Sequence, residues 1–408
     1  MKKILSTIII LLTTSAVAQT QRVIVLSQFT QSEINTHSPV NPDNLLHQAK
    51  SDARGTVNYF AQRNAFTVDL NATAIGANNA ASEFNMRVRE LFGETTLGPI
   101  DITAGRKIFR WGTGYVKNPA AFANPEKRTD DVTDRTRSQV GRDVLMASYY
   151  RESSDFQFLY LPDLRTSHGN VSLDENELIF KAYTLVGEHD LSFMINWRQH
   201  GNERIGLTWA HTLNDALELH AEWAGQHGSN RRYHINQSID QPFTIHSNNP
   251  YILKTEKKLY NELIVGLNYT THFGVNIITE YSYEQTGIAN KNWQQLMRYS
   301  NWLNSLPTTP ELMPAIAGNL KWVALSLNHP RHTIFTRLAY VYNDLSFECL
   351  NLLNPQDQSS YLLGGITYEW KNRCDFELRA SRFLGSAKST FDSLPSQQEL
   401  FIGMRCYF

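Results

Sequence analysis

The chain has 408 residues, with 38 Lys and Arg against 39 Asp and Glu, and its formal net charge of −1 gives no long-range attraction to nucleic acid. Its three cysteines, an odd number, do not make a disulfide scaffold. A charged fraction of 19% and a negative mean hydropathy exclude a bundle of membrane-spanning helices. A secreted soluble protein or a membrane β-barrel remains.

The N-terminus has the pattern of a secretory signal peptide. Lys2 and Lys3 precede an apolar run over residues 4–12, and an Ala-Val-Ala stretch ending at Ala18 offers a cleavage site. The apolar run is roughly half the length of about 20 residues that a membrane anchor needs. We therefore predict that residues 1–18 are a signal peptide cleaved near Ala18.

Residues 19–65 differ in pattern from the rest of the chain. Residues 23–26 could form a short strand, and Asn41 followed by Pro42 can start a short helix. We predict a separate N-terminal segment, and the sequence leaves open whether it lies in the periplasm or inside a barrel.

From about residue 66 onward, apolar and polar residues alternate with period two, which is typical of strands. Leu191, Phe193 and Trp197, for example, alternate with Ser192 and Asn196. The pattern predicts about sixteen strands, near residues 66–75, 83–92, 99–109, 142–151, 155–161, 177–186, 189–199, 203–212, 215–225, 257–270, 273–285, 319–328, 331–343, 359–370, 373–383 and 398–408.

The connections between these strands alternate in length. Tight connections such as residues 187–188 alternate with a second set of connections, most of which are long, such as 110–141 and 226–256. Short turns at one end and long loops at the other are the layout of outer-membrane barrels. We therefore predict an all-β fold, a transmembrane antiparallel β-barrel of about 16 strands (14–18) over residues 66–408, with short periplasmic turns and long extracellular loops.

The last ten residues fit this fold. Leu400, Ile402, Met404, Cys406 and Phe408 form one apolar row, which we expect to face lipid, and the chain stops on an aromatic residue. A terminal aromatic residue on an amphipathic last strand resembles the signal by which such barrels are handed to the barrel assembly machinery.

A more specific pattern lies in residues 89–119. It comprises Arg89, Glu90, Leu91, Gly105, Arg106, Trp111, Gly112, Asn118 and Pro119. Over this stretch the chain resembles the outer-membrane channel families that include the alginate-export porins, with Lys107 where a glutamine is usual. The resemblance implies an outer-membrane channel and leaves its substrate open. Independently, Gly112 and Gly114 allow sharp backbone turns at the top of a strand, and Pro119 keeps the following loop out of helix or ladder.

The stretch that follows is densely charged. We predict that residues 110–143 fold into the lumen as a constriction, because charges of both signs near a pore select solutes by size and charge. The alternative is a solvated surface loop. The candidate constriction and lumen residues are Arg87, Arg89, Asp101, Lys107, Arg110, Glu126, Arg128, Asp130, Asp131, Asp134, Arg135 and Arg137.

Alternation also assigns charged residues to the lumen side of the wall, where we expect them to meet water. They are Glu218, Glu222, Glu262, Glu280, Glu284, Arg337, Glu377, Arg379 and Arg405.

Two further patterns concern the strand ends and loops. Cys374 and Cys406 fall at the periplasmic ends of neighbouring strands, so a disulfide between them is a hypothesis. In residues 286–318, Trp293, Leu296 and Leu303 recur at helical spacing. They predict a helix that either packs on the barrel mouth or lines a vestibule for a carbohydrate.

We interpret the chain as a monomeric or trimeric porin-like channel for small hydrophilic solutes, in contact with outer-membrane lipid and lipopolysaccharide. The alternatives are a plugged receptor or polysaccharide anchor and, as a further rival, an outer-membrane hydrolase. We predict no catalytic residue, metal site or cofactor, because no hydrolase elbow, zinc motif or phosphate-binding loop occurs.

Overall fold

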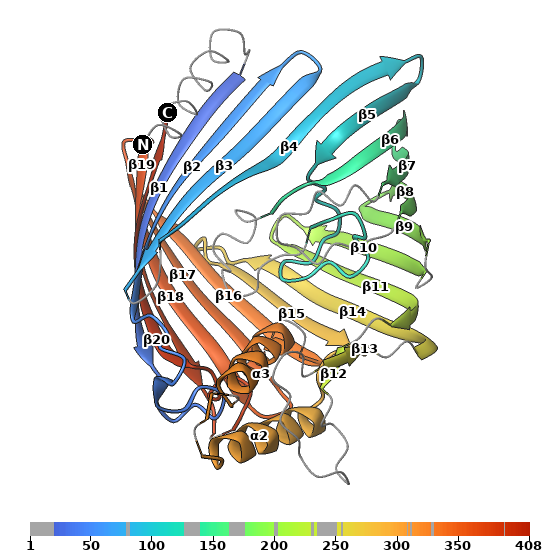
Figure 1. Cartoon of the computed structure of the whole chain (residues 1–408). Coiled ribbons are helices and arrows are strands. Elements are labelled where there is room, and N and C mark those ends of the chain that lie inside the picture. The colour runs from blue at the N-terminus through green and yellow to red at the C-terminus, as the bar shows by residue number, and fades with distance from the viewer. Residues whose placement is uncertain are drawn as a thin grey trace.

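The computed structural model describes residues 20–78, 82–125, 139–162, 176–199, 203–229, 232–234, 251–253, 256–307, 309–310, 312–327, 330–386 and 388–408. Eighteen antiparallel strands form one closed barrel (Figure 1). They are β1 (Thr20–Ile34), β2 (Ser51–Arg63), β3 (Phe66–Ala77), β4 (Glu83–Leu97), β5 (Ile100–Lys107), β6 (Arg142–Arg151), β7 (Ser154–Leu161), β8 (Glu177–Val186), β9 (His189–Arg198), β10 (Arg204–Asn214), β11 (Leu217–Ser229), β14 (Glu256–Thr270), β15 (Asn276–Glu284), β16 (His332–Tyr342), β17 (Leu345–Asn354), β18 (Ser359–Trp370), β19 (Cys374–Leu384) and β20 (Ser396–Tyr407).

The first and last strands close the barrel. β1 pairs antiparallel with β20 from Ile24 opposite Tyr407 to Ile34 opposite Ser396, and its other edge pairs with β2. The start of β1 and the end of β20 therefore lie at the same end of the barrel (Figure 1), where the amide of Phe408 donates to the carbonyl of Val23 at 2.9 Å. Closure leaves no strand edge of this sheet unpaired.

This closure corrects the prediction for the N-terminal segment. Residues 20–34 and 51–63 are barrel strands, so the barrel begins near Thr20 rather than at residue 66. The two strands are rich in polar residues on both faces, which weakened the period-two signal. The strand number of eighteen lies at the upper end of the predicted range.

Two further strand predictions need correction. The strand predicted over residues 319–328 belongs instead to helix α3 (Leu312–Leu327), whose buried Leu312, Ile316 and Val323 recur at helical spacing. The stretch from residue 344, which the sequence suggested was a loop, contains β17. Leu350 and Leu352 make β17 apolar on its inner face as well, so it lacks a clean alternation.

The two faces of the wall are distinguished by consecutive residues. Trp197 is 47% exposed on the outer face, whereas the neighbouring Asn196 is fully buried on the lumen side. On the last strand Leu400, Ile402 and Phe408 are exposed outward, as predicted. The outer surface of the barrel is therefore apolar, as a membrane-facing wall requires.

Short turns gather at the end of the barrel where β1 starts and β20 ends, and the longer loops at the other. Over the latter end lie helix α2 (Asn290–Asn304), α3, the 3-10 turn η1 (Pro42–Asn44) and the β19–β20 loop. A small hairpin, β12 (Arg232–His234) and β13 (Tyr251–Leu253), belongs to the β11–β14 connection. No described helix is long and apolar enough to cross a membrane.

The predicted helix of residues 286–318 is present as α2. Its buried residues include Trp293, Leu296 and Leu303, and they pack with Val40 from the β1–β2 connection and with α3. Hydrogen bonds from Asn304 to the Pro39 carbonyl and from the Trp293 indole to the Lys388 carbonyl fix it to two loops. We call α2, α3, residues 35–50 and the described residues of 385–395 the cap.

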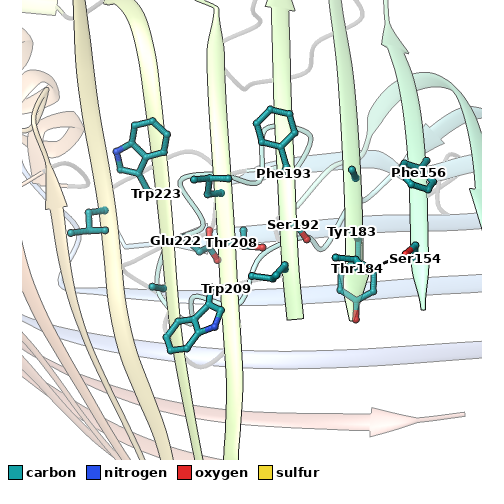
Figure 2. Close-up of a pocket in the computed structure, with 15 residues that line it drawn as sticks. Ser154, Phe156, Tyr183, Thr184, Ser192, Phe193, Thr208, Trp209, Glu222 and Trp223 are labelled. Atoms are coloured by element: carbon teal, nitrogen blue, oxygen red, sulfur yellow. Dashed lines mark hydrogen bonds between the residues drawn. The ribbon is translucent and has the colours of Figure 1, made fainter. Parts of the chain in front are cut away.

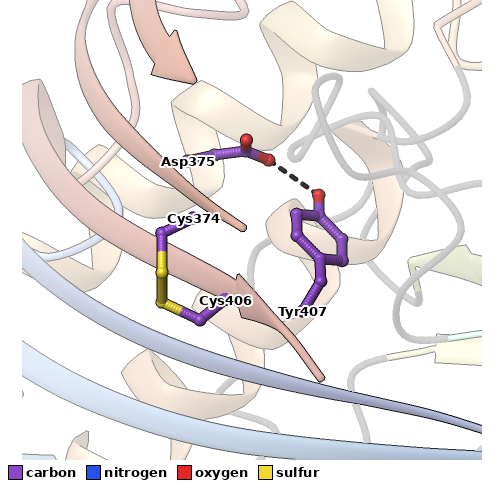
Figure 3. Close-up of a disulfide and its surroundings, with 4 residues drawn as sticks. All are labelled: Cys374, Asp375, Cys406 and Tyr407. Carbon is purple, nitrogen blue, oxygen red and sulfur yellow. Dashed lines mark hydrogen bonds between the residues drawn. A yellow bond between two sulfur atoms is a disulfide. The ribbon is translucent and has the colours of Figure 1, made fainter. Parts of the chain in front are cut away.

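Cys374 and Cys406 form a disulfide between β19 and β20 (Figure 3). The two residues face each other in the ladder, with Cα atoms 4.1 Å apart. Beside them, Tyr407 donates a hydrogen bond to Asp375 at 2.7 Å. The bond therefore ties the closing strand to its neighbour near the end of the barrel where β1 starts.

Replacing both bridged cysteines by serine is expected to lower the free energy of unfolding by about 2–4 kcal/mol, because the cross-link restricts the unfolded chain. Denaturant titration of the folded barrel, followed by tryptophan fluorescence, measures this. The control is Cys349→Ser, because Cys349 is free and exposed on β17. Equal midpoints for the double variant and the control would contradict the expectation.

Candidate functional site

The β5–β6 loop turns into the barrel. After Lys107 the chain crosses the lumen, and residues 112–118 reach the inner faces of β11 and β15, far away in sequence (Figure 1). Their contacts on the wall lie near the middle of both strands. We call the described residues 108–125 the inward loop.

Glu222 on β11 receives the first part of the inward loop. Its Oε1 accepts hydrogen bonds from the amides of Thr113 at 2.5 Å and Gly114 at 2.8 Å, and from Asn118 Nδ2 at 2.8 Å. The Thr113 hydroxyl lies at 3.4 Å from the same oxygen. A fully buried carboxylate is stable only when it is hydrogen-bonded, and here the loop supplies the donors.

Glu280 on β15 receives the next two residues. The amide of Tyr115 donates to its Oε1, and the amide of Val116 donates to its Oε2 at 2.9 Å. His220 Nε2 lies 2.9 Å from Oε1 and fixes this carboxylate from β11. Four consecutive amides of the loop thus point at two wall carboxylates. An ion pair of Lys117 with Glu284, at 3.0 Å, continues the row.

Two glycines are required by the conformation of the inward loop and by its close approach to the wall. Gly112 has φ +84°, and a Cβ there would lie 2.5 Å from Glu222 Oε1 and 2.6 Å from Asn118 Nδ2. A Cβ at Gly114 would lie 2.1 Å from the Lys117 carbonyl oxygen. Only glycine therefore lets the backbone pass this close to the wall.

The other motif residues shape the loop itself. Asn118 Nδ2 also donates to the Gly114 carbonyl at 2.9 Å, which closes the turn. The Asn124 side chain accepts from the Trp111 amide and donates to the Trp111 carbonyl, at 2.9 and 2.7 Å. Arg106 makes a two-pronged ion pair with Asp143 across β5 and β6, at 3.0 and 2.8 Å.

Apolar packing holds the underside of the inward loop. One cluster joins the loop to the inner faces of β6 to β11, and a second joins it to β15 to β18. The first contains Phe109, Ala120, Phe122, Ala123, Val144, Met146, Leu159, Leu161, Ile179, Met194 and Ala224, and the second contains Val116, Ile278, Phe335, Leu350, Leu352, Tyr361, Leu363 and Phe391. Much of this side of the lumen is therefore filled by side chains of the loop and wall.

The structure places some of the predicted constriction residues near the root of the loop. Arg89 forms an ion pair with Asp69 at 3.3 Å and donates to the Gln139 carbonyl, and Lys107 pairs with Glu94 at 2.6 Å. Arg110 is exposed at the start of the loop.

Two others lie on the wall. Arg87 is opposite Asn71 in the β3–β4 ladder, and Asp101 accepts from Thr96 at the short-turn end, away from the loop. Glu126, Arg128, Asp130, Asp131, Asp134, Arg135 and Arg137 fall outside the described residues.

The wall carboxylates differ from the prediction in their surroundings. Glu222 and Glu280 lie on the lumen side as expected, but both are buried under the inward loop instead of facing water. The period-two alternation predicted on which side of the wall these two residues lie. Their role as acceptors depends on contacts to residues more than one hundred positions away, for which the sequence carries no local signal.

A groove of about 570 Å³ lies on the outer face of β7 to β11 and β14 (Figure 2). Phe156, Phe193, Trp209 and Trp223 surround it, and all belong to the apolar outer wall. It is therefore a lipid-facing feature rather than part of the lumen. Among the described residues, no group of three or more His, Cys, Asp or Glu side chains is arranged to hold a metal ion.

No model of a known protein family matches the chain, and no curated protein sequence is significantly similar to it. Solved structures do share the fold. OccAB3 of Acinetobacter baumannii and OpdL of Pseudomonas aeruginosa are each 9% identical, with a TM-score of 0.54 over 95% of this chain and 98% of theirs. Wzi, a carbohydrate-binding outer-membrane β-barrel involved in capsule assembly in Escherichia coli, is 9% identical, with a TM-score of 0.53 over 97% of this chain and 86% of its own. At these identities the similarity concerns the fold alone, and the chain has the fold of an outer-membrane β-barrel.

Proposed function

We propose that the protein is an outer-membrane channel for small hydrophilic solutes, and that the inward loop narrows its lumen. The observation that carries the proposal is the row of loop amides bound to Glu222 and Glu280 at mid-height of an eighteen-stranded barrel. Barrels of this strand number are wide enough for an aqueous channel. A loop fixed across such a lumen restricts what passes.

The remaining aqueous path is proposed to follow the opposite wall. There the inner faces of β2 and β3 carry uncharged polar pairs, with Asn71 donating to Asn58 at 2.6 Å and Thr56 and Thr73 in contact at 3.2 Å. Charged residues lie on the same faces, among them Asp69, which is ion-paired with Arg89. Amide and hydroxyl groups suit hydrated solutes of either charge. The charged residues 126–137 are proposed to add selectivity by charge, as loop charges do in other pores.

The setting of the channel follows from the same proposal. The signal peptide, insertion by the barrel assembly machinery and contact with lipopolysaccharide belong to it, with the short turns on the periplasmic side. A homo-oligomer is compatible with it. The narrower resemblance to alginate-export porins rests on the motif of residues 89–119, most of whose later residues shape or attach the inward loop.

A second candidate is a closed barrel that binds a carbohydrate or anchors a polysaccharide. The observation that favours it is the cap, in which α2 and α3 are fixed to residues 35–50 and to the β19–β20 loop. Ser38, for example, donates to the Ser393 carbonyl at 2.7 Å. We propose no enzymatic activity, and a single Ser or His substitution that abolished lipid or glycan cleavage would contradict this.

Single-channel recording of the folded mature protein in a planar bilayer tests the channel against the closed barrel. We expect steady open steps, with an ion selectivity in asymmetric salt that changes on charge reversal at Arg128 or Arg135. A correctly folded protein that never conducts would refute the channel and favour the carbohydrate-binding barrel. The matched control is charge reversal at Arg382, which is exposed on the outer face of β19.

A further inference from the structure

We infer that Glu222 and Glu280 are the positioning residues of the pore, because they hold the inward loop at mid-height and so set the width of the channel. We call their contacts with residues 113–118 the latch. The inference rests on the proposed channel function and adds the device that fixes the constriction.

The latch satisfies the hydrogen-bonding groups of the loop and of the wall only while the loop lies against the wall. Glu222 is fully buried and Glu280 is 2% exposed, although lumen-facing carboxylates of a wide barrel ordinarily reach water. Among the described residues, every hydrogen-bond donor to these two carboxylates other than His220 belongs to the loop. Neither carboxylate forms an ion pair with a Lys or Arg among the described residues. At these two carboxylates the loop is thus held by amide donors instead of by paired charges.

Four consecutive backbone amides aimed to one side form the kind of concavity that binds anions in other proteins. Here the anions are built into the wall, on two strands separated by β14. Hydrogen bonds to a charged acceptor are the stronger ones, so losing one shifts the ratio of held to released loop by roughly tenfold or more. The two carboxylates are therefore the groups whose removal frees the loop.

Residue-level hydrogen exchange of the folded full chain tests the latch directly. Glu222→Ala is expected to speed exchange of the Thr113 and Gly114 amides by roughly tenfold or more, and Glu280→Ala is expected to do the same at Tyr115 and Val116. Glu218→Ala is the matched control, because Glu218 lies on the same strand and face nearer the short turns. We expect it to leave all four amides unchanged.

The glutamine variants distinguish a latch from general loosening. On Glu222 the donors from Thr113, Gly114 and Asn118 all bind Oε1, so Glu222→Gln keeps a carbonyl oxygen for them. Its exchange rates are therefore expected to stay close to those of the parent. On Glu280 the amides of Tyr115 and Val116 bind different oxygens, so Glu280→Gln loses one acceptor. It is expected to expose one of these two amides. These variants also serve if an alanine variant fails to fold.

Conductance of the same variants gives the second readout. We expect Glu222→Ala and Glu280→Ala to spend more time in a wider open level than the parent and Glu218→Ala. Unchanged exchange in residues 113–116 would refute the latch, and faster exchange without any change in the open level would refute its control of pore width. A folded parent barrel that never conducts would refute the channel function itself, and the exchange data would still decide whether the latch exists.

Discussion

Replacing Gly112 by alanine is expected to release the inward loop and to widen the open level of the channel. The residue has φ +84°, a conformation that costs an alanine on the order of 1–3 kcal/mol. Its new Cβ would also lie 2.5 Å from Glu222 Oε1, so the carboxylate and the loop cannot keep their contact. We expect faster exchange at the Thr113 and Gly114 amides together with larger single-channel currents.

A second glycine separates strain from release. Gly187 in the β8–β9 turn also has a positive φ, of +62°, but an added Cβ would meet no atom within 4 Å. Gly187→Ala is therefore expected to lower stability slightly and to leave the currents unchanged. Single-channel currents that increased equally in both variants would indicate a general loosening of the barrel and would contradict a specific role for Gly112.

The barrel was predictable because its signal is local. Alternation in a strand assigns each residue to one face, so Leu400 and Ile402 on the outside and Glu222 and Glu280 on the inside followed from period two alone. Alternation of short and longer connections then predicted a barrel with short turns at one end and long loops at the other. Strands whose two faces are chemically alike were not predicted. They are β1 and β2, which have many polar residues, and β17, which has an apolar inner face.

The helix α3 shows the limit of counting periods in short apolar stretches. Residues 319–328 fit an alternating pattern, but over sixteen residues Leu312, Ile316 and Val323 fit the helical period better. The packing partners of this stretch decide between strand and helix, because α3 packs against α2 in the cap and does not join the barrel wall.

The latch could be predicted only in part. The sequence marked Gly112 and Gly114 as residues of a sharp turn and Asn118 as part of the motif, and it placed Glu222 and Glu280 on the lumen side. It could not pair the two sets, because the contact joins residues 104 to 165 positions apart and depends on how the loop packs over the apolar inner wall. Long-range contacts of this kind leave no periodic trace in the chain.

Deleting residues 20–50, with residues 1–19 retained, is expected to abolish the folded barrel. The deletion removes β1 and leaves β2 to meet β20, and these two strands run in the same direction. An antiparallel ladder between them is impossible, so the barrel stays open. Unpaired backbone groups at such an edge cost several kcal/mol each inside a bilayer, so the open sheet cannot persist there. Heat-modifiable migration on gels and protease resistance in outer-membrane fractions measure the loss.

The matched variant removes more of the chain and should do less damage. Deleting residues 20–63 takes away β1 and β2 together, so that β20 meets β3, which runs antiparallel to it as β1 does. Sixteen strands can then close, since an even number preserves the alternation of directions. We expect this variant to retain more heat-modifiable protein than the shorter deletion. If residues 20–63 were instead a plug, both deletions would leave a folded barrel with a wider open level. The amount of heat-modifiable protein in the two variants therefore decides between strand and plug.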